Sequence, residues 1–225
     1  MTNRTALVTG AGIGGLAVAV ALAQAGRSPV VLEEVDVVEP LDGSVFLDPN
    51  ALAALDDLGV GDLVRSRARI TPDPSTGTFS FQVARVDVQT APLEALGSGR
   101  VRTGSAICCA RQDDRLARVH LIDRGDLASP LLVDATGLDS PVRASVLGKK
   151  AQRSDLRRRA SGCVAFVGAE LEPLGDAVAL AAALADEPIL VDALERYARA
   201  PRTAAEAPAP RRRRVFAPRV AVAPA

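Results

Sequence analysis

A run of glycines directly after a short apolar strand constrains this fold more than any other feature of the sequence. An apolar segment over residues 6–8 leads into Gly10, Gly12 and Gly15, which are spaced as GxGxxG. An alanine-rich helical segment follows, and the next apolar segment ends at Glu33. Because a strand, a tight glycine turn, a helix and a second strand come in this order, the sequence predicts a parallel strand–helix–strand unit at the start of an α/β fold.

Each residue type in this turn has a physical reason to hold a dinucleotide. Gly10 permits the tight turn, Gly12 lets a diphosphate approach the backbone, and Gly15 lets the helix pack close to the strand. The helix N-terminus offers free N–H groups to the diphosphate. Glu33, at the tip of the second strand, is placed to accept both hydroxyl groups of an adenosine ribose, and its charge opposes a 2′-phosphate. The candidate cofactor-binding residues are therefore Gly10, Ala11, Gly12, Ile13, Gly14, Gly15, Glu33 and Glu34.

Two other interpretations of this unit were weighed. A glycine-rich crossover without any ligand is the alternative that stays open. A short-chain dehydrogenase is excluded, because Leu16 stands where that family needs a glycine and Tyr197 has no lysine four residues later.

The composition narrows the function further. With 3% aromatic residues and no tryptophan, the 225-residue chain lacks the stacking platform of a single-stranded nucleic-acid binder. Three cysteines and one histidine lack ligand spacing, so we expect no metal site. We find neither a signal segment nor an apolar run of membrane-spanning length, and so expect a cytoplasmic protein that binds no membrane and no nucleic acid. Its cysteines are then reduced structural thiols, and the strand neighbours Cys108 and Cys109 are expected to face opposite ways.

Patterning beyond the first unit predicts the remaining elements. Asp48 followed by Pro49 starts a helix that ends at Gly59, because the aspartate can cap and proline suits the first turn. Residues 35–47 are expected to be irregular and 71–78 to form a loop. Alternating hydrophobicity predicts strands at 101–110, 116–122 and 131–135, as a small meander returning to the main sheet, and at 164–167; helices are expected at 176–184 and from Pro188 onward.

Three stretches together resemble the flavin-dependent aromatic hydroxylases, the p-hydroxybenzoate hydroxylase-like FAD monooxygenases. They are the fingerprint at 10–17 with Glu33, the helix that begins Pro49-Asn50-Ala51-Leu52, and the segment from Leu131 to Arg143. The resemblance implies a Rossmann-like, three-layer FAD/NAD(P)-binding α/β fold with a small β-meander. It also implies FAD as cofactor, NAD(P)H as electron donor and a small aromatic substrate. It adds Arg85, Thr136 and Gly137 to the candidate cofactor-binding residues and leaves the catalytic residues unknown.

The chain departs from that family in three ways. Thr136 replaces the aspartate of the second motif, and Gly168-Ala169-Glu170 stands where the third motif has Gly-Asp-Ala-Ala-His, with Glu170 as a candidate substitute. The substrate domain between these motifs is largely absent. The expected organisation is an FAD-binding domain over 1–148 with a reduced insertion at 65–100, a basic linker over 149–160 in place of the substrate domain, a C-terminal strand and helices over 161–200 that return to the FAD-binding domain, and a disordered basic Ala/Pro tail over 201–225.

Three functional hypotheses follow. The first is an FAD-dependent monooxygenase-like oxidoreductase of the aromatic-ring hydroxylase type, weakly active alone or completed by a partner subunit or homo-oligomer. The second is a non-catalytic dinucleotide-binding remnant. The third is an interaction protein that uses the basic runs at 149–159 and 211–214 to bind an anionic surface, where the plainer interpretation of these runs is solvated chain.

Overall fold

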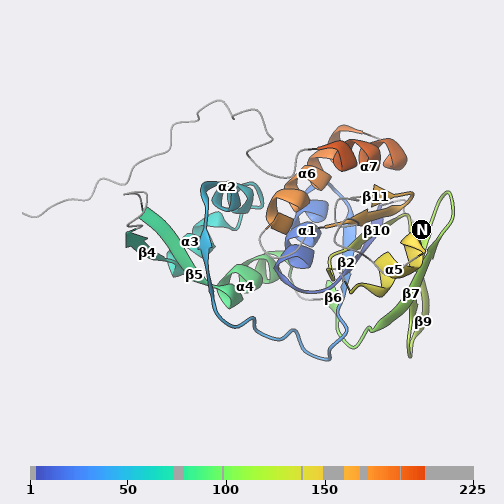
Figure 1. Ribbon diagram of the computed structural model, residues 1–225, viewed down its shortest axis with the longest axis horizontal. Helices are drawn as coiled ribbons and strands as arrows, with labels where there is room; N and C mark the ends of the chain where they lie inside the picture. The colour runs from blue at the N-terminus through green and yellow to red at the C-terminus, as the bar shows by residue number, and fades with distance from the viewer. Residues whose placement is uncertain are drawn as a thin grey trace, which may run out of the picture.

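A six-stranded, mostly parallel sheet forms the centre of the molecule in the computed structural model (Figure 1). Its strand order is β11-β12-β10-β1-β2-β6, and β11 is the antiparallel edge strand. The strands are β1 (Thr5–Thr9), β2 (Ser28–Leu32), β6 (Val101–Arg102), β10 (Leu131–Asp134), β11 (Ala160–Ser161) and β12 (Val164–Phe166). The structure describes residues 4–72, 79–97, 99–137, 139–148, 160–167, 172–187 and 189–200.

Both faces of this sheet are covered, so the centres of its strands β1, β10 and β12 are continuous apolar runs rather than alternating with polar residues. Ala6 and Val8 of β1 point into one buried cluster, whereas Leu7 points into the other. In β10, Val133 joins the first cluster and Leu132 the second. Successive side chains of a strand alternate between faces, so a continuous apolar run of this length serves two cores at once.

Helices cover the first face. α1 (Ile13–Gln24) packs against α6 (Glu172–Asp186) and α4 (Arg85–Leu96), and α6 in turn packs against α7 (Leu190–Arg199). The hydroxyl group of Tyr197, a fully buried residue of α7, donates to the Phe166 carbonyl oxygen at 3.0 Å. This contact fixes α7 to the end of β12.

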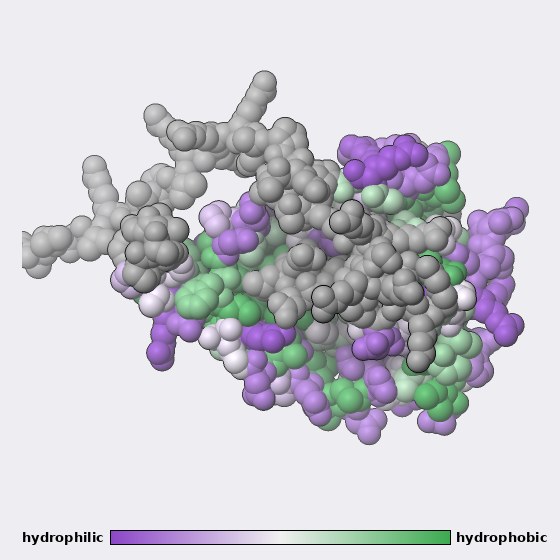
Figure 2. Space-filling view, viewed as in Figure 1, coloured by the Kyte–Doolittle hydropathy of each residue, from purple (hydrophilic) through white to green (hydrophobic). Residues whose placement is uncertain are grey.

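The second face carries an antiparallel meander and a short helix. The meander has the order β7-β8-β9, formed by β7 (Ile107–Gln112), β8 (Ala117–Leu121) and β9 (Gly125–Ser129), and α5 (Pro141–Leu147) lies beside it. The side chains of β8 alternate between buried and exposed, as expected for a sheet with one wet face. Figure 2 shows hydrophilic surface at the side of the molecule where the β7–β8 turn lies.

A second three-stranded sheet lies at the other end of the molecule (Figure 1). Its order is β3-β5-β4, formed by β3 (Ser44–Leu47), β4 (Arg69–Pro72) and β5 (Phe79–Ala84). Beside it lie α2 (Pro49–Asp57) and α3 (Gly61–Arg67). The predicted start of α2 is confirmed: Asp48 Oδ1 accepts from the backbone N–H groups of Asn50 and Ala51, at 2.9 and 2.7 Å. Gly59 follows that helix with a φ of 72°.

Several expected boundaries are wrong. The segment 101–110 is two strands in two different sheets, and the third strand of the meander is β9 rather than the segment 131–135, which forms β10 of the main sheet. Residues 35–47, expected to be irregular, contain β3. The expected insertion at 65–100 contains helix α4, which runs through Pro92. Val88, Ala91 and Pro92 are buried on that helix, so tertiary packing outweighs the local cost of proline.

The expectation that Cys108 and Cys109 face opposite ways is also wrong. Ile107 pairs with Leu121 and Cys109 with His120, so Cys108 is the extra residue of a β-bulge. A bulge breaks the strict alternation of side chains, and the two sulfur atoms lie 3.6 Å apart. Cys108 is exposed and Cys109 half-buried, which removes both from the class of structural thiols; Cys163 is buried, as expected.

Candidate functional site

The three glycines of the fingerprint play distinct structural roles. Gly10 has a φ of 90°, and a Cβ atom on it would lie 3.1 Å from Thr136 Cγ2. A Cβ atom on Gly15 would lie 1.9 Å from the Gly10 carbonyl oxygen, so only glycine allows the helix to approach the turn this closely. A Cβ atom on Gly12 meets no heavy atom of the described residues within 4 Å. The absence of a side chain at Gly12 therefore serves no internal contact and leaves the backbone open to a ligand.

Gly12 is also the N-cap of α1, and no side chain caps that helix. The helix has no acidic residue in its first turn. Its first N–H groups and the positive end of its dipole are thus left for an anion. Ile13 and Gly14, two more candidate residues, form the buried first turn of the helix.

Glu33 lies at the carboxyl end of β2, next to the glycine turn. Its Oε2 atom accepts from the Ala11 backbone N–H at 2.6 Å, and its Oε1 atom accepts from the Glu34 N–H at 2.8 Å. These two bonds hold the carboxylate at the turn. The Oε1 atom also accepts from the Val35 N–H at 3.4 Å, whereas Oε2 accepts only from Ala11 among the described residues and so keeps an acceptor position for a ribose hydroxyl group.

A hollow of 270 Å³ opens at this edge of the sheet. Glu33 and Glu34 line it from the end of β2, Thr9 and Gly10 from β1, and Thr136 from β10. Ser105 and Ile107 close it from the meander side. The structure therefore brings together the glycine turn, the acidic residues and the second motif, as expected where the carboxyl ends of parallel strands meet.

Gln89 is a residue of this site that the sequence analysis missed. Its Nε2 atom donates to the Ala11 carbonyl oxygen at 3.1 Å, and its Oε1 atom accepts from the Leu41 N–H at 3.2 Å. The side chain is 3% exposed. Gln89 thus fixes the glycine turn from α4, and the available sequence signal was a polar residue beside the apolar positions Val88 and Ala91 of that helix.

Arg85 lies one helical turn before Gln89 on α4, and residues four apart share a helix face. Its side chain is half-buried, and its Nε atom is buried without a hydrogen-bond partner among the described residues. Arg85 therefore shares a helix face with Gln89, which holds the glycine turn, and its Nε–H group is a donor that a ligand could use.

The second motif is built differently from the family pattern. Asp134 is 1% exposed, and its Oδ1 atom accepts from the hydroxyl groups of Thr9 and Thr136, at 3.0 and 2.6 Å. Its Oδ2 atom is buried without a hydrogen-bond partner among the described residues. This carboxylate thus lies two residues before position 136, where the family pattern has its aspartate, and it accepts the hydroxyl hydrogen of Thr136. Gly137 follows with a φ of 88° and leaves open space at its α-carbon within the described part of the chain.

Some predicted residues lie outside the described residues. These are Gly168 and Glu170 of the third motif, both basic runs at 149–159 and 211–214, and the tail over 201–225. Within the described residues no group of three metal-ligating side chains occurs, and no helix there is long and apolar enough to cross a membrane.

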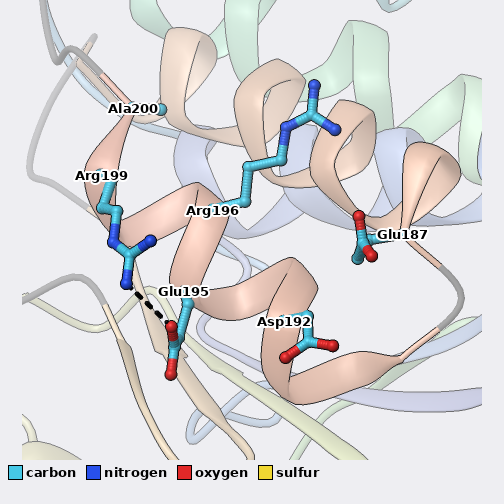
Figure 3. Close-up of a pocket in the computed structure, with 6 residues that line it drawn as sticks. All are labelled: Glu187, Asp192, Glu195, Arg196, Arg199 and Ala200. Atoms are coloured by element: carbon cyan, nitrogen blue, oxygen red, sulfur yellow. Dashed lines mark hydrogen bonds and ion pairs between the residues drawn. The ribbon is translucent and has the colours of Figure 1, made fainter.

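A larger hollow of 540 Å³ lies on α7, away from the glycine turn (Figure 3). Both of its arginines are paired with carboxylates: Arg199 bonds Glu195 at 2.9 Å, and Arg196 bonds Asp186 at 2.9 Å. No glycine of the described residues lines this hollow, and Asp192 places a negative charge at the first turn of α7, so it does not suit a dinucleotide. The fingerprint edge remains the candidate site, and the fold together with this site is typical of the dinucleotide-binding α/β class.

Comparison with known proteins narrows this class. An FAD-dependent urate hydroxylase of Klebsiella pneumoniae is 30% identical over 169 residues, covering 66% of this chain and 44% of the relative. A 3-hydroxybenzoate 6-hydroxylase of Klebsiella oxytoca is 42% identical over 169 residues, covering 64% of this chain and 42% of the relative. The chain therefore spans less than half the length of these curated relatives. No protein-family model matches it.

A solved structure agrees with the sequence relatives. That of an HpxO variant of Klebsiella pneumoniae complexed with FAD aligns with a TM-score of 0.72 at 19% identity, over 87% of this chain and 84% of that chain. This similarity shows the fold, and the predicted mixed α/β fold is confirmed. The homologues of this chain are FAD-dependent aromatic hydroxylases, which confirms the resemblance to the p-hydroxybenzoate hydroxylase-like flavin monooxygenases.

Proposed function

We propose that this chain binds FAD by its adenosine diphosphate end and acts as an oxidoreductase of the aromatic-hydroxylase type. One observation carries the proposal: among three closely spaced glycines, a Cβ atom added to the one at the helix N-terminus would meet no heavy atom of the described residues within 4 Å. A purely structural turn would have no use for that glycine. The relatives' names supply the identity of the dinucleotide.

The residues present fit the adenosine diphosphate half of FAD. Gly12 and the first N–H groups of α1 would hold the diphosphate, and Glu33 would accept the ribose hydroxyl groups. Gln89 keeps the Ala11 peptide in place while the ligand binds. Arg85 and Gly137 are the residues that we assign to the flavin half. The Thr136 hydroxyl oxygen would accept a hydrogen bond from the flavin half, because its own hydrogen is donated to Asp134.

Bound flavin supplies the redox chemistry in such enzymes, and the protein supplies position and a dry cavity. In this chain, the buried Asp134 carboxylate accepts from Thr9 and Thr136 and so holds both side chains in position at the site. We propose NAD(P)H as the electron donor and a small aromatic molecule as the substrate. A partner subunit or second copy would complete the cavity above the flavin. The three cysteines, free within the described residues, support a reducing compartment, the cytoplasm.

A non-catalytic dinucleotide-binding remnant is the second candidate. The second motif favours it, because a threonine hydroxyl group held by Asp134 cannot supply the charge of the aspartate that the family pattern has there. Both candidates bind FAD and differ in turnover.

Binding and turnover separate these candidates. Purified chain is titrated with FAD, with ADP as a probe for the adenosine half, and the flavin absorption of the complex is recorded after gel filtration. Saturable binding of both compounds supports the site, and failure of both refutes it. NAD(P)H oxidation is then followed with a phenolic substrate: we expect hydrogen peroxide and little hydroxylated product from the isolated chain. Stoichiometric product would show that the chain builds its own substrate cavity, and no oxidation at all would favour the remnant.

A further inference from the structure

Two neighbouring thiols meet on the outer face of the meander, far in sequence from the glycine turn. Cys108 is the extra residue of the bulge in β7, and its Sγ atom lies 3.6 Å from Cys109 Sγ. Cys108 is exposed and Cys109 is half-buried. Adjacent cysteines on a regular strand point to opposite faces, so the bulge is what creates this pair.

The pair stands beside a hollow of 320 Å³. Cys109 lines the hollow together with His120, its cross-strand partner, and Asp126 of β9. The His120 Nδ1 atom bonds the Asp126 carboxylate, which orients the ring. Arg111 and Arg118 add positive charge to the same hollow. Cys109 therefore faces a hollow that also presents an imidazole ring, a carboxylate and two guanidinium groups.

The two thiols have different roles in their contact. Cys108 donates its hydrogen to the Cys109 sulfur. The neighbouring Cys109 thiol raises the pKa of Cys108 above its ordinary value, because deprotonation would break this bond. Because Cys108 is the donor of this contact and Cys109 is the cysteine that lines the hollow, we assign Cys109 as the attacking sulfur.

We propose that Cys108 and Cys109 form a modification site, a vicinal dithiol that hydroperoxides oxidise reversibly to a disulfide within the chain. The Cys109 thiolate attacks the terminal oxygen of the hydroperoxide, the O–O bond breaks, and an alcohol or water leaves after taking up a proton. The Cys109 sulfenic acid that results is attacked by the Cys108 sulfur; the S–O bond breaks, and water leaves with the Cys108 proton. In total, two thiols and one hydroperoxide give one disulfide, one alcohol (water if the oxidant is hydrogen peroxide) and one water.

The product is expected to be easily reduced. A disulfide between adjacent residues closes a small ring, and strained, exposed disulfides are the labile ones. Cys163 provides an internal contrast, because it is buried and burial raises the pKa of its thiol. We expect it to stay reduced while the pair reacts.

Peptide mapping tests this proposal directly. The reduced full chain is treated with hydrogen peroxide, the remaining thiols are alkylated under denaturing conditions, and the chain is digested with trypsin. Cleavage at Arg102 and Arg111 places both neighbouring cysteines in the peptide 103–111, separate from Cys163. We expect that peptide to lose two hydrogens, to resist alkylation and to recover with dithiothreitol. The rate of disulfide formation should not change when the protein concentration is raised about tenfold, because the reaction lies within one chain.

Three variants complete the test. Cys108→Ser should accumulate a sulfenic acid at Cys109 that dimedone traps severalfold more than in the unmodified chain, because the second thiol is missing. Cys109→Ser should be the slower of the two to react. The matched control Cys163→Ala should form the 103–111 disulfide as the parent does. Disulfides between chains, direct oxidation of both thiols to sulfinic acid, or equal reactivity of Cys163 would each overturn the proposal.

Discussion

A methyl group added at Gly15 tests the close packing of the glycine turn, whereas one added at Gly12 tests the approach of the diphosphate to it. Gly15→Ala places its Cβ atom 1.9 Å from the Gly10 carbonyl oxygen and 3.0 Å from the Gly10 carbonyl carbon. Alanine recovers about 1 kcal/mol of helix propensity, but overpacking against backbone costs about 1–3 kcal/mol or more. Because a 1.9 Å approach is extreme, we expect a net loss of about 2 kcal/mol, which lowers Tm by about 4–8 °C for a chain of this size.

Gly12→Ala is expected to lower FAD affinity while changing Tm little. Its new methyl group meets nothing within 4 Å in the described structure, and its φ of −71° and ψ of 178° suit alanine. The change of N-cap residue costs about 0.5–1 kcal/mol, so Tm falls by at most about 4 °C. The methyl group stands where the diphosphate must approach, and we expect FAD affinity to fall at least about tenfold, or 1.4 kcal/mol.

Differential scanning fluorimetry gives Tm for both variants, and fluorescence titration gives the Kd for FAD. Unchanged affinity in Gly12→Ala would refute the diphosphate assignment at this backbone. An unchanged Tm in Gly15→Ala would refute the steric argument independently of any ligand. The two readouts are thus separable.

Three further predictions concern single side chains. Glu33→Gln keeps an oxygen for the Ala11 N–H but loses the charge and the acceptor for the Glu34 N–H, so FAD binding should weaken by about 1–3 kcal/mol in the same titration; an equal Kd would contradict the ribose assignment. Tyr197→Phe removes a buried donor from the Phe166 carbonyl oxygen and should cost about 1–2 kcal/mol in urea unfolding, whereas a neutral result would mean that this hydrogen bond does not hold α7 in place. The N–H groups of Arg115 and Leu116 lower the pKa of Asp113 by stabilising its charged form. Such a group stabilises the fold above its unfolded pKa of about 3.9 and loses this effect as pH falls through the lower folded value. The Tm advantage over Asp113→Asn at pH 6 should therefore shrink by pH 3, and a pH-independent difference would exclude this linkage.

The second motif shows where residue-by-residue comparison with a family loses information. Thr136 was expected at the cofactor in place of an aspartate, with the loss of a charge. The structure shows that a carboxylate is present after all, two residues earlier at Asp134, buried and bound to that same threonine. Its other partner, Thr9, is 125 residues away in sequence. Spacing along the chain cannot reveal a pairing that two parallel strands create.

Local sterics explain what the sequence alone determined. Gly10 and Gly15 predict the strand–turn–helix unit because only glycine allows these backbone approaches, and Asp48 predicts the start of α2 because its carboxylate reaches N–H groups two and three residues ahead. The continuous apolar strands predict a sheet covered on both faces. Each of these signals depends on neighbours within a few residues.

Only the tertiary structure decided which residues support the site and which thiols meet. Gln89 reaches the glycine turn across 78 residues, and the helix around Pro92 persists because its buried face packs on α1. The bulge at Cys108 arises from how β7 pairs with β8, so alternation along the strand gave the wrong faces. These features depend on contacts between distant segments, whose energies outweigh local preferences and leave no pattern along the chain.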